Sequence, residues 1–438
     1  MSVLKKARLG ILLVLCIILG GTSQNILDYK LVLYIASILM IGWILTDGSR
    51  ESLSRLNIAP MWVLGAFGAL YCLYIIPLPP EIWTSLPGRN IVKEGFDILS
   101  LPLPYLPASL TPEMSFLSML HLLPPLAILL ITLLCARQTE LKWAFYAVLG
   151  MAVGSIILGL LQLLMGGTDF YLYEYSHFGL ASGFFSNANH QASFLVMILP
   201  FAVYMALAGR SGKTSNSLIP QHFAVGVCFV FLTMVGIVLT GSIAGYMLAA
   251  IVFPLSFYVM SRGGYVNYPL MLLVVTIFSS FLVFDFLVLG NYSQELIDEF
   301  TINIRPQIFI TSLEAGKGYF PFGSGPGSFE ATYLFYQDKS SIYPNYVNKA
   351  HNDYVQLFHE LGVFGIFLCL LLITGLARLV YLYLISPVKR SEKIYALCVV
   401  SFLAVAMHSV ADYPLRTPAI SALGAFLIGI IWRKNYSS

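Results

Sequence analysis

Long apolar stretches alternate with short polar connections along almost the whole 438-residue chain. A bilayer core of about 30 Å takes roughly 20 apolar residues to cross as a helix. Lys5, Lys6 and Arg8 precede the first stretch and no small-residue cleavage motif follows it, so we expect it to be retained as a helix. The pattern therefore predicts an all-α polytopic membrane protein with about twelve transmembrane helices. Their approximate positions are 9–26, 31–46, 60–80, 116–135, 143–165, 190–208, 222–240, 242–260, 269–289, 361–385, 394–413 and 417–432.

The longest polar interruption, residues 290–355, separates the ninth predicted span from the tenth. It contains a helix-like stretch that begins at Arg305, with Pro306 in the expected first turn. A loop of this length without a disorder-type composition is usually functional. We therefore divide the chain into transmembrane helices one to nine (1–289), an outer loop domain that carries part of the site (290–355), and helices ten to twelve (356–438).

The distribution of Lys and Arg predicts the orientation, because cytoplasmic loops of membrane proteins carry an excess of positive charge. With the N-terminus inside, the inner side holds 16 of the 24 Lys and Arg residues and the outer side holds eight. The eight outer residues are Lys30, Arg89, Lys93, Arg305, Lys317, Lys339, Lys349 and Arg416. We therefore expect both chain ends to be cytoplasmic and the long loop to be outside.

The composition excludes several other classes of protein. Hydrophobic residues make up 58% of the chain and charged residues only 10%, a balance that soluble globular domains do not reach. The net charge of +3 comes without a basic block, which argues against a nucleic-acid partner. All six cysteines fall in predicted spans and none forms a C-x-x-C pair, so we expect neither an outer disulfide nor a cysteine-bound metal.

The stretch KAHNDYVQLFHELGV, which begins at Lys349, is the densest group of ionisable residues and lies at the outer end of the tenth predicted span. His351 is placed at the start of the helix, and Asn352, Gln356 and His359 follow at i, i+4 and i+7 on one face. An interfacial helix with polar groups wetted by lipid headgroups is the simpler interpretation. A zinc site is not expected, because the second histidine of H-E-x-x-H is absent.

The glycine cluster GSGPGSF contains Gly323, Gly325 and Gly327. It fits neither G-x-x-x-x-G-K-[ST] nor a strand-to-helix G-x-G-x-x-G, so a nucleotide-binding loop is not predicted. A tight turn that packs against the membrane domain is the expected structure. Backbone N–H groups of such a turn can also meet an anion.

His408 and Asp412 are four residues apart near the outer end of the eleventh predicted span, and Arg416 follows just beyond it. Ionisable groups within or beside a span are functional candidates by default. The simpler alternative is that His408 and Asp412 pair with each other inside the helix bundle. A further polar group, Asn187, Asn189 and His190 in FFSNANHQASF, lies just outside the sixth predicted span.

The predicted orientation brings the scattered candidates to one face of the membrane. Arginine binds phosphate oxygens bidentately, and histidine exchanges a proton near neutral pH. Together they favour a phosphate-bearing lipid as the substrate. The residues that carry this inference are His190, Arg305, Lys317, Lys349, His351, Asp412 and Arg416.

On four stretches the sequence resembles the O-antigen ligase and O-antigen polymerase superfamily of bacterial inner-membrane glycosyltransferases. The first 180 residues resemble it in hydropathy alone. Any one stretch is weak evidence, whereas the four in this order are more specific. They are FFSNANHQASFL (184–195), RPQIFITSLEAGKGYFPFGSGPGSF (305–329), HNDYVQLFHELGVFG (351–365) and HSVADYPLRTPAI (408–420).

The resemblance implies transfer of a glycan from an undecaprenyl-diphosphate carrier to an acceptor sugar hydroxyl at the periplasmic face, without nucleotide, metal or cofactor. It places the essential histidine of the family at His351 and the contacts to the donor diphosphate at Arg305 and Arg416. Many members carry an arginine after T-G-S, where this chain has Ile243. Lys317 or Lys349 is expected to replace that arginine, unless the donor is held differently.

We expect supporting roles for further polar residues of the same stretches, which are Asn187, Asn189, His190, Asn352, Asp353, His408 and Asp412. The expected partners are the lipid-linked donor, a glycan or lipid A-core acceptor, the lipid bilayer and a chain-length regulator. The expected location is the bacterial cell inner membrane, in lipopolysaccharide or exopolysaccharide assembly.

Several alternatives stay open at this point. Ligation, polymerisation of repeat units and transfer to protein by an O-oligosaccharyltransferase are not separated by the sequence. A transporter or flippase of lipid-linked glycans is the alternative from another class. It predicts polar residues distributed through the spans to the midplane.

Overall fold

The computed structural model describes residues 3–24, 27–46, 59–208, 219, 223–262, 298–339, 347–385 and 392–434. This part of the chain is mostly helical. The ninth predicted span, 269–289, lies outside the described residues, as do parts of the outer loop domain at 290–297 and 340–346.

Helices, two short strands and short helical turns follow one another along the described chain. In order they are α1 (Val3–Leu19), α2 (Leu27–Thr46), α4 (Ala59–Ile75), β1 (Pro77–Leu78), α5 (Pro80–Trp83), α6 (Asn90–Ile98), β2 (Leu106–Pro107), α7 (Pro112–Leu120), α8 (Leu123–Leu130), η1 (Ile131–Cys135), α9 (Gln138–Met165), α10 (Ala188–Ala208), α11 (Phe223–Leu239), α12 (Ile243–Ser261), α15 (Asp298–Gly318), α16 (Phe329–Tyr333), α17 (Asp353–Leu361), α18 (Val363–Val380), η5 (Tyr381–Ile385), α19 (Lys393–His408), η7 (Pro414–Arg416) and α20 (Pro418–Lys434).

Five helical segments of the described chain are long and apolar enough to cross a membrane. Four shorter apolar helices accompany them, at Lys30–Thr46, Phe223–Leu239, Lys393–His408 and Pro418–Arg433. The prediction of a helical membrane protein is therefore confirmed, whereas the number of twelve spans stays a prediction. The five long segments are Pro112–Leu134, Gln138–Met165, Ala188–Ala208, Ile243–Ser261 and Val363–Ile385.

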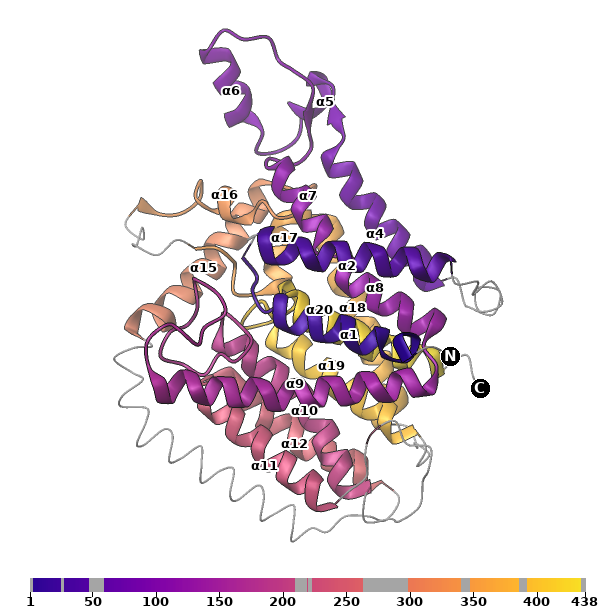
Figure 1. Ribbon diagram of the computed structural model, residues 1–438. Helices are drawn as coiled ribbons and strands as arrows, with labels where there is room; N and C mark the ends of the chain where they lie inside the picture. The colour runs from indigo at the N-terminus through magenta and orange to yellow at the C-terminus, as the bar shows by residue number, and fades with distance from the viewer. Residues whose placement is uncertain are drawn as a thin grey trace.

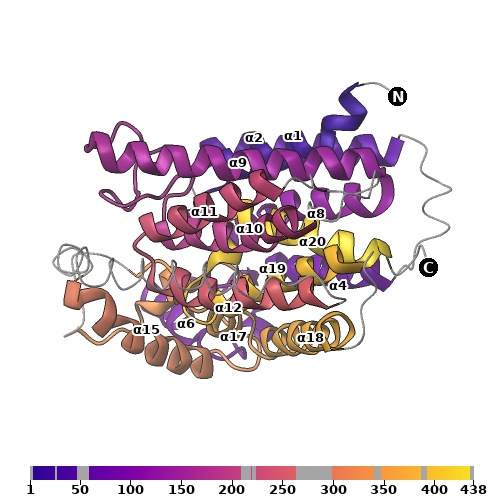
Figure 2. The same ribbon diagram turned by 90° about the horizontal axis from the view of Figure 1, so that it is seen from below.

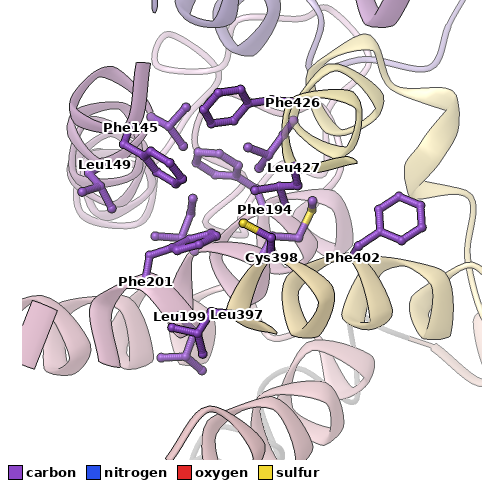
Figure 3. Close-up of a cluster of buried hydrophobic side chains, with 14 of the residues drawn as sticks. Phe145, Leu149, Phe194, Leu199, Phe201, Leu397, Cys398, Phe402, Phe426 and Leu427 are labelled. Atoms are coloured by element: carbon purple, nitrogen blue, oxygen red, sulfur yellow. The ribbon is translucent and has the colours of Figure 1, made fainter. Parts of the chain in front are cut away.

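Helix α10 forms the centre of the bundle, with 89% of its most apolar window buried. Its apolar side chains pack against those of α9, α19 and α20 (Figure 3). The ring of Phe145 contacts Phe201 of α10 and Phe426 of α20 edge to face, at centroid distances of 5.2 and 5.1 Å. A helix that is surrounded by other helices is expected to be apolar on all of its faces.

Helix α11 approaches α10 closely because a glycine lies at their contact. A Cβ at Gly226 would lie 2.2 Å from the backbone nitrogen of Ala206, so a larger residue would push the helices apart. Such contacts between small residues are typical of helix pairs in membranes. The next boundary is also as predicted, because α11 ends at Leu239 and α12 begins at Ile243, with Gly241 at φ +66° between them.

The two ends of the helix bundle differ. In both views α1 begins and α20 ends on the same side, while α15 lies at the opposite end (Figures 1 and 2). This arrangement places the described part of the outer loop domain away from the chain ends. The candidate site lies at that loop end.

A small arm projects from the bundle beside α4 and α7 (Figure 1). Strands β1 and β2 close it as an antiparallel pair, with Pro77 opposite Pro107. Arg89, which is 2% exposed, donates hydrogen bonds to carbonyl groups of Pro87 and Ala108 in the arm and, at 3.1 Å, of Gly323 in the glycine cluster. A buried guanidinium thus fixes the arm to the loop domain.

The polar stretch and the tenth span form two helices. Gly362 separates α17 from α18 with φ +56°, and a Cβ there would lie 2.1 Å from the carbonyl oxygen of Pro321. A left-handed residue under a close backbone contact requires glycine. Pro306 also departs from expectation, because α15 begins at Asp298 and the proline lies inside the helix rather than in its first turn.

Candidate active site

Helix α17 holds His351 at a fixed position just before its first turn. The Asn352 side chain caps the helix by accepting hydrogen bonds from the backbone N–H of Tyr354 and Val355, each at 3.0 Å. Its amide also donates to the carbonyl of Val410 at 2.8 Å, which fastens α17 to the segment after α19. His351 has φ +48°, a backbone conformation that residues other than glycine seldom adopt. Such conformations are concentrated at functional sites.

Asp412 is the centre of a buried polar cluster at this end of the bundle. Its carboxylate accepts a hydrogen bond from the Asn189 amide at 2.8 Å. The nearest imidazole nitrogens lie 3.5 Å away on His351 and 3.9 Å away on His190, and a guanidinium nitrogen of Arg305 lies at 3.9 Å. We call these five residues the Asp412 cluster. The sequence elements that supply them are far apart along the chain, as the outer-face prediction required.

The turn after α19 gives Asp412 its position. The backbone N–H of Asp412 donates to the carbonyl of His408 at 2.9 Å, and the Arg305 guanidinium donates to the carbonyl of Ala411 at 3.2 Å. The Tyr413 ring then packs edge to face against both His190 and His351, with centroid distances of 5.0 Å in each case. The aromatic ring therefore contacts both imidazoles and limits their rotation.

The charges around Asp412 keep its carboxylate ionised. Burial by itself would raise the pKa of Asp412, but His351, His190 and Arg305 outweigh that effect and hold the pKa well below its usual value. The Asp412 side chain is 1% exposed, whereas those of His351 and Arg305 are 23% and 32% exposed. A buried anion thus faces two cationic or titratable groups that a ligand can reach.

Several nitrogen atoms around Asp412 have no hydrogen-bond partner within the described part of the chain. They are both ring nitrogens of His190, Nδ1 of His351, Nε of Arg305 and Nε2 of His408. Buried polar atoms in proteins are nearly always hydrogen-bonded, so each exception calls for an explanation. Their concentration around one carboxylate marks this cluster as the candidate site.

His408 does not pair with Asp412 through a hydrogen bond. Its Nδ1 lies 2.6 Å from the hydroxyl oxygen of Ser193, on α10. The alternative that the two residues satisfy each other is therefore not what the geometry shows. Asn187 lies beside the cluster, where its side-chain oxygen accepts a hydrogen bond from the backbone N–H of Asn189 at 2.8 Å.

A second polar cluster surrounds Arg416. Its Nε donates to Asp353 at 3.2 Å, and its Nη1 lies 3.3 Å from Glu360. Gln356 donates to Glu360 at 2.8 Å, and the Ser409 hydroxyl donates to Asp353 at 2.9 Å. We call Asp353, Gln356, Glu360 and Arg416 the Arg416 cluster.

The two carboxylates neutralise the guanidinium of the Arg416 cluster. Burial would lower the pKa of Arg416, but Glu360 and Asp353 raise it above its usual value. Burial raises the pKa of Asp353 to about 6 in spite of the opposing charge of Arg416. Much of the hydrogen-bonding capacity of Arg416 is therefore used inside the protein, and its assignment to the donor diphosphate stays a prediction.

The structure separates the two lysines that were candidates for phosphate binding. Lys317 is exposed in the last turn of α15. It lies 12 residues after Arg305, a separation of about 18 Å along the helix axis. Lys349 is half-buried and lies two residues before His351. Burial, and then the like charge of Arg416, lower the pKa of Lys349. Lys349 is thus beside the site and Lys317 is remote from it.

The glycine cluster forms a packed turn. All three glycines have positive φ, and a Cβ at Gly323 would lie 2.4 Å from the carbonyl oxygen of Glu360. The turn therefore supports α17 by direct backbone contact, in agreement with the tight-turn prediction. Ile243, at the position of the family arginine, is the first residue of α12 and is 60% exposed.

Sequence reasoning missed several residues that the structure brings to the site. Tyr413 and Glu360 lacked a recognisable pattern. His177 lies in the connection between α9 and α10, and burial lowers its pKa while the charge of Asp412 opposes that effect. Outside both clusters, the Lys30 ammonium lies 3.1 Å from Nε2 of His121, and both could have been found because they are ionisable residues in or beside apolar stretches.

The chemistry available in this arrangement is proton transfer and anion binding. Among the described residues there is no group of three or more His, Cys, Asp and Glu side chains with metal-site geometry. A histidine backed by an ionised aspartate, next to a partly exposed guanidinium, is suited to activating a hydroxyl beside an anionic leaving group.

Comparison with known proteins finds a family model that matches part of the chain. Residues 228–370 match the family model described as O-antigen ligase, which confirms the resemblance to this superfamily. The match contains Arg305 and His351 and ends before Asp412. No curated protein matches the chain.

Proposed function

With the match of residues 228–370 to the O-antigen ligase family model as the premise, we propose that the protein transfers a glycan from an undecaprenyl-diphosphate carrier to an acceptor sugar hydroxyl. The family is one of glycosyltransferase-type enzymes acting in membranes. The observation that carries the proposal is the Asp412 cluster, in which His351, Arg305 and Asp412 meet at the loop end of the bundle.

In the proposed step, His351 is the general base. With Nδ1–H directed at Asp412 Oδ1, 3.5 Å away, the lone pair of the neutral imidazole lies on Nε2. Nε2 accepts the proton of the acceptor hydroxyl while its oxygen forms the bond to the anomeric carbon. The bond from that carbon to the carrier phosphate breaks, and its electron pair leaves with the diphosphate. Asp412 then stabilises the imidazolium.

Arg305 is proposed to bind the departing diphosphate. Its guanidinium is 32% exposed, and its Nε has no hydrogen-bond partner among the described residues. A guanidinium can offer two parallel N–H donors to phosphate oxygens, and charge stabilisation at a developing anion is a large catalytic contribution. Arg416, by contrast, is proposed to position α17 through its carboxylate partners.

The rest of the cluster supports this reaction. Asn189 fixes the Asp412 carboxylate by a 2.8 Å hydrogen bond, and His190 adds a second imidazole to the same anion. The energy for transfer is already present in the sugar–diphosphate bond, so we propose a metal-independent reaction without nucleotide or cofactor.

The arrangement favours an enzyme over a flippase. A transporter binds its substrate near the bilayer midplane, at broken helices. In this protein the candidate residues lie at element ends, since Asn189 is the second residue of α10 and Asp412 follows α19. We propose that this end faces the periplasm, with both termini of the chain in the cytoplasm and the protein in the bacterial inner membrane.

The acceptor defines three variants of the proposed reaction. A ligase transfers a finished glycan to lipid A-core, a polymerase joins repeat units under a chain-length regulator, and a protein O-oligosaccharyltransferase uses a protein hydroxyl. The products of a deletion strain separate them. One retained repeat unit identifies a polymerase, whereas polymer that accumulates on the carrier identifies a ligase.

Transfer by the purified protein in nanodiscs tests the proposal directly. Wild type should move glycan from the undecaprenyl-diphosphate donor to acceptor, and His351→Ala should lower turnover about 10²–10⁴-fold, the usual contribution of a general base. The matched control is His359→Gln. His359 is buried and contacts Thr332 at 2.8 Å, so its loss should lower the amount of folded protein more than turnover per folded molecule. Near-normal turnover in His351→Ala would contradict the assignment.

A further inference from the structure

The arm, residues 77–107, exposes an apolar face of its helix α6. Ile98 and Leu99 are 81% and 68% exposed, and both belong to the face on which the apolar residues of α6 gather. Lys93 and Asp97 form an ion pair on the opposite face, with 3.2 Å between Nζ and Oδ2. A helix with one apolar and one charged face is typical of segments that lie in the plane of a membrane interface.

The segment that follows α6 extends this apolar surface. Residues 98–112 contain no charged side chain, and both Leu101 and Tyr105 are more than half exposed. Tyrosine is enriched where a protein meets the boundary between lipid and water. A Cβ at Gly95, on the apolar face of α6, would meet no atom of the described chain within 4 Å. The part of the protein that the structure describes therefore leaves this surface uncovered.

The arm lies beside the helix bundle and near its loop end. In Figure 1, α1, α2 and α9 run across the view between the two ends of the bundle, and the arm projects sideways from them. In both views α6 lies on the same side as α15, away from the chain ends (Figures 1 and 2). The helical segment Pro112–Leu134, which is long and apolar enough to cross a membrane, begins five residues after β2. A bilayer that surrounds this segment therefore reaches the arm at the level of one leaflet.

We propose that the arm inserts its apolar surface into the membrane leaflet at the loop end and thereby fixes the depth of α17. The partner is the boundary between headgroups and acyl chains. Apolar burial is the driving force, because the exposed charges of the arm are three acidic and one basic and so are not attracted to anionic lipid. These exposed residues are Glu81, Lys93, Glu94 and Asp97. The inference goes beyond the proposed function and does not depend on it.

Hydrogen bonds connect the arm to α17 through the glycine cluster. The Arg89 guanidinium of the arm donates to the carbonyl of Gly323 at 3.1 Å. The backbone N–H groups of Ser324 and Gly325 then donate to two carbonyls in the last turn of α17, at 3.1 and 2.8 Å. The connection is short and consists largely of backbone atoms. An arm that is seated in the leaflet therefore holds α17, and His351 before its first turn, at one depth relative to the lipid headgroups.

Fluorescence quenching in nanodiscs of zwitterionic lipid tests the insertion on the full-length protein. After replacement of the native cysteines, Ile98→Cys carries an environment-sensitive fluorophore, and Lys93→Cys on the opposite face of α6 is the matched control. Interfacial helices lie about 5–10 Å into the headgroup and acyl boundary. The fluorophore at 98 should therefore show blue-shifted emission and be quenched by lipids with a nitroxide near the headgroup. The fluorophore at 93 should be quenched by aqueous iodide.

Each other result has a defined meaning. Equal quenching by iodide at positions 98 and 93, without quenching by lipid, would place the arm in water and overturn the proposal. A blue shift at 98 without quenching by lipid would mean that a protein surface, such as a second copy of the chain, covers the arm, and would overturn it as well. If quenching by lipid at 98 increased with the fraction of anionic lipid, apolar burial would not be the driving force. Tyr105→Cys is the second labelling position if Ile98→Cys does not fold, and the same result is expected there.

The depth of α17 is tested with a fluorophore at Val363→Cys. Val363 is the first residue of α18, directly after α17, and is 42% exposed. Ile98→Asp combined with Leu99→Asp should release the arm, so that quenching at 363 shifts between nitroxides placed at different depths of the acyl chain. Lys93→Asp adds the same carboxylate to the opposite face and should leave this quenching pattern unchanged. An unchanged pattern in the Ile98→Asp and Leu99→Asp variant would overturn the role of the arm in positioning α17. Failure of glycan transfer by wild type would contradict the proposed function alone, because no part of the quenching measurement uses the reaction.

Discussion

The Asp412 cluster and the Arg416 cluster lie at the same end of the bundle and are built from the same kinds of side chain, yet their charges are balanced differently. The first has one carboxylate facing a guanidinium and two imidazoles, and the second has one guanidinium facing two carboxylates. Among the described residues, unpartnered buried nitrogen atoms occur in the first cluster and not in the second. The Asp412 cluster therefore still has hydrogen-bond donors that a ligand can use, whereas the Arg416 cluster stabilises the packing of the helices.

This comparison also explains how α17 serves both purposes. Asp353 and Glu360, at its two ends, face Arg416, while Asn352 and His351 precede its first turn. Removing one partner of a buried ion pair costs about 3–5 kcal/mol, because the other charge is left alone. The Arg416 cluster thus keeps the helix rigid, and a rigid helix keeps His351 in its left-handed conformation beside Asp412.

The largest predicted effect comes from neutralising the central carboxylate of the Asp412 cluster. Asp412→Asn should lower turnover about 10²–10⁴-fold at unchanged protein abundance, because the amide no longer stabilises the His351 imidazolium. Glu360→Gln is the matched carboxylate in the Arg416 cluster. It should keep turnover per folded molecule within a few-fold of wild type while lowering the thermal midpoint.

The two quantities to measure are the turnover normalised to folded protein and the thermal midpoint from a size-exclusion thermostability assay. If Glu360→Gln lost turnover as strongly as Asp412→Asn, the two clusters would be one functional unit and the comparison would fail.

A smaller effect is expected from exchanging the two arginines for lysine. Arg305→Lys keeps the charge and loses the two-pronged donor, so we expect donor KM to rise about tenfold with little change in the thermal midpoint. Arg416→Lys cannot reach both carboxylates, so it should lower the midpoint and leave donor KM nearly unchanged. A rise of donor KM in Arg416→Lys alone would return the diphosphate contact to Arg416, as the sequence predicted.

The fold was predictable where local pattern decides it. Apolar length alone located α9, α10 and α12, and the predicted boundary between 222–240 and 242–260 agrees with the end of α11 and the start of α12. The separation of α17 from α18 was not predictable in the same way. The left-handed Gly362 is set by the backbone of Pro321, 41 positions earlier in the chain, and no local pattern carries that contact.

The candidate site was predictable as a set of residues and not as a geometry. His351, Arg305 and Asp412 were brought to one face by the orientation argument, and the structure places them together. Spacing alone suggested that His408 pairs with Asp412, because residues at i and i+4 share a helix face. The helix ends at His408, however, and the turn after it directs the carboxylate toward Asn189 instead.

The smallest predicted effect distinguishes the two aspartates by pH. Burial raises the pKa of Asp353 to about 6 from the usual 3.8, so between these pH values the folded protein keeps a proton that the unfolded chain has lost. The stabilisation is complete below about pH 4 and is lost as the pH rises through 6. The thermal midpoint of Asp353→Asn minus that of wild type should therefore rise from pH 4 to 6 and then stay level.

Asp412→Asn is the control, because the pKa of Asp412 is shifted in the opposite direction to that of Asp353. The pKa of Asp412 lies well below 3.8, so its carboxylate is ionised in both the folded and the unfolded chain above about pH 5 and its contribution to stability changes only at lower pH. Between pH 5 and 7 the Asp412 carboxylate itself therefore adds no slope to the difference in midpoint between Asp412→Asn and wild type, and any slope there comes from the side chains that contact Asp412. Titrating groups that do not contact the substituted residue are common to both proteins and cancel in each difference. A level curve for Asp353→Asn from pH 4 to 6 would mean that Arg416 outweighs burial and that Asp353 is ionised as fully as Asp412.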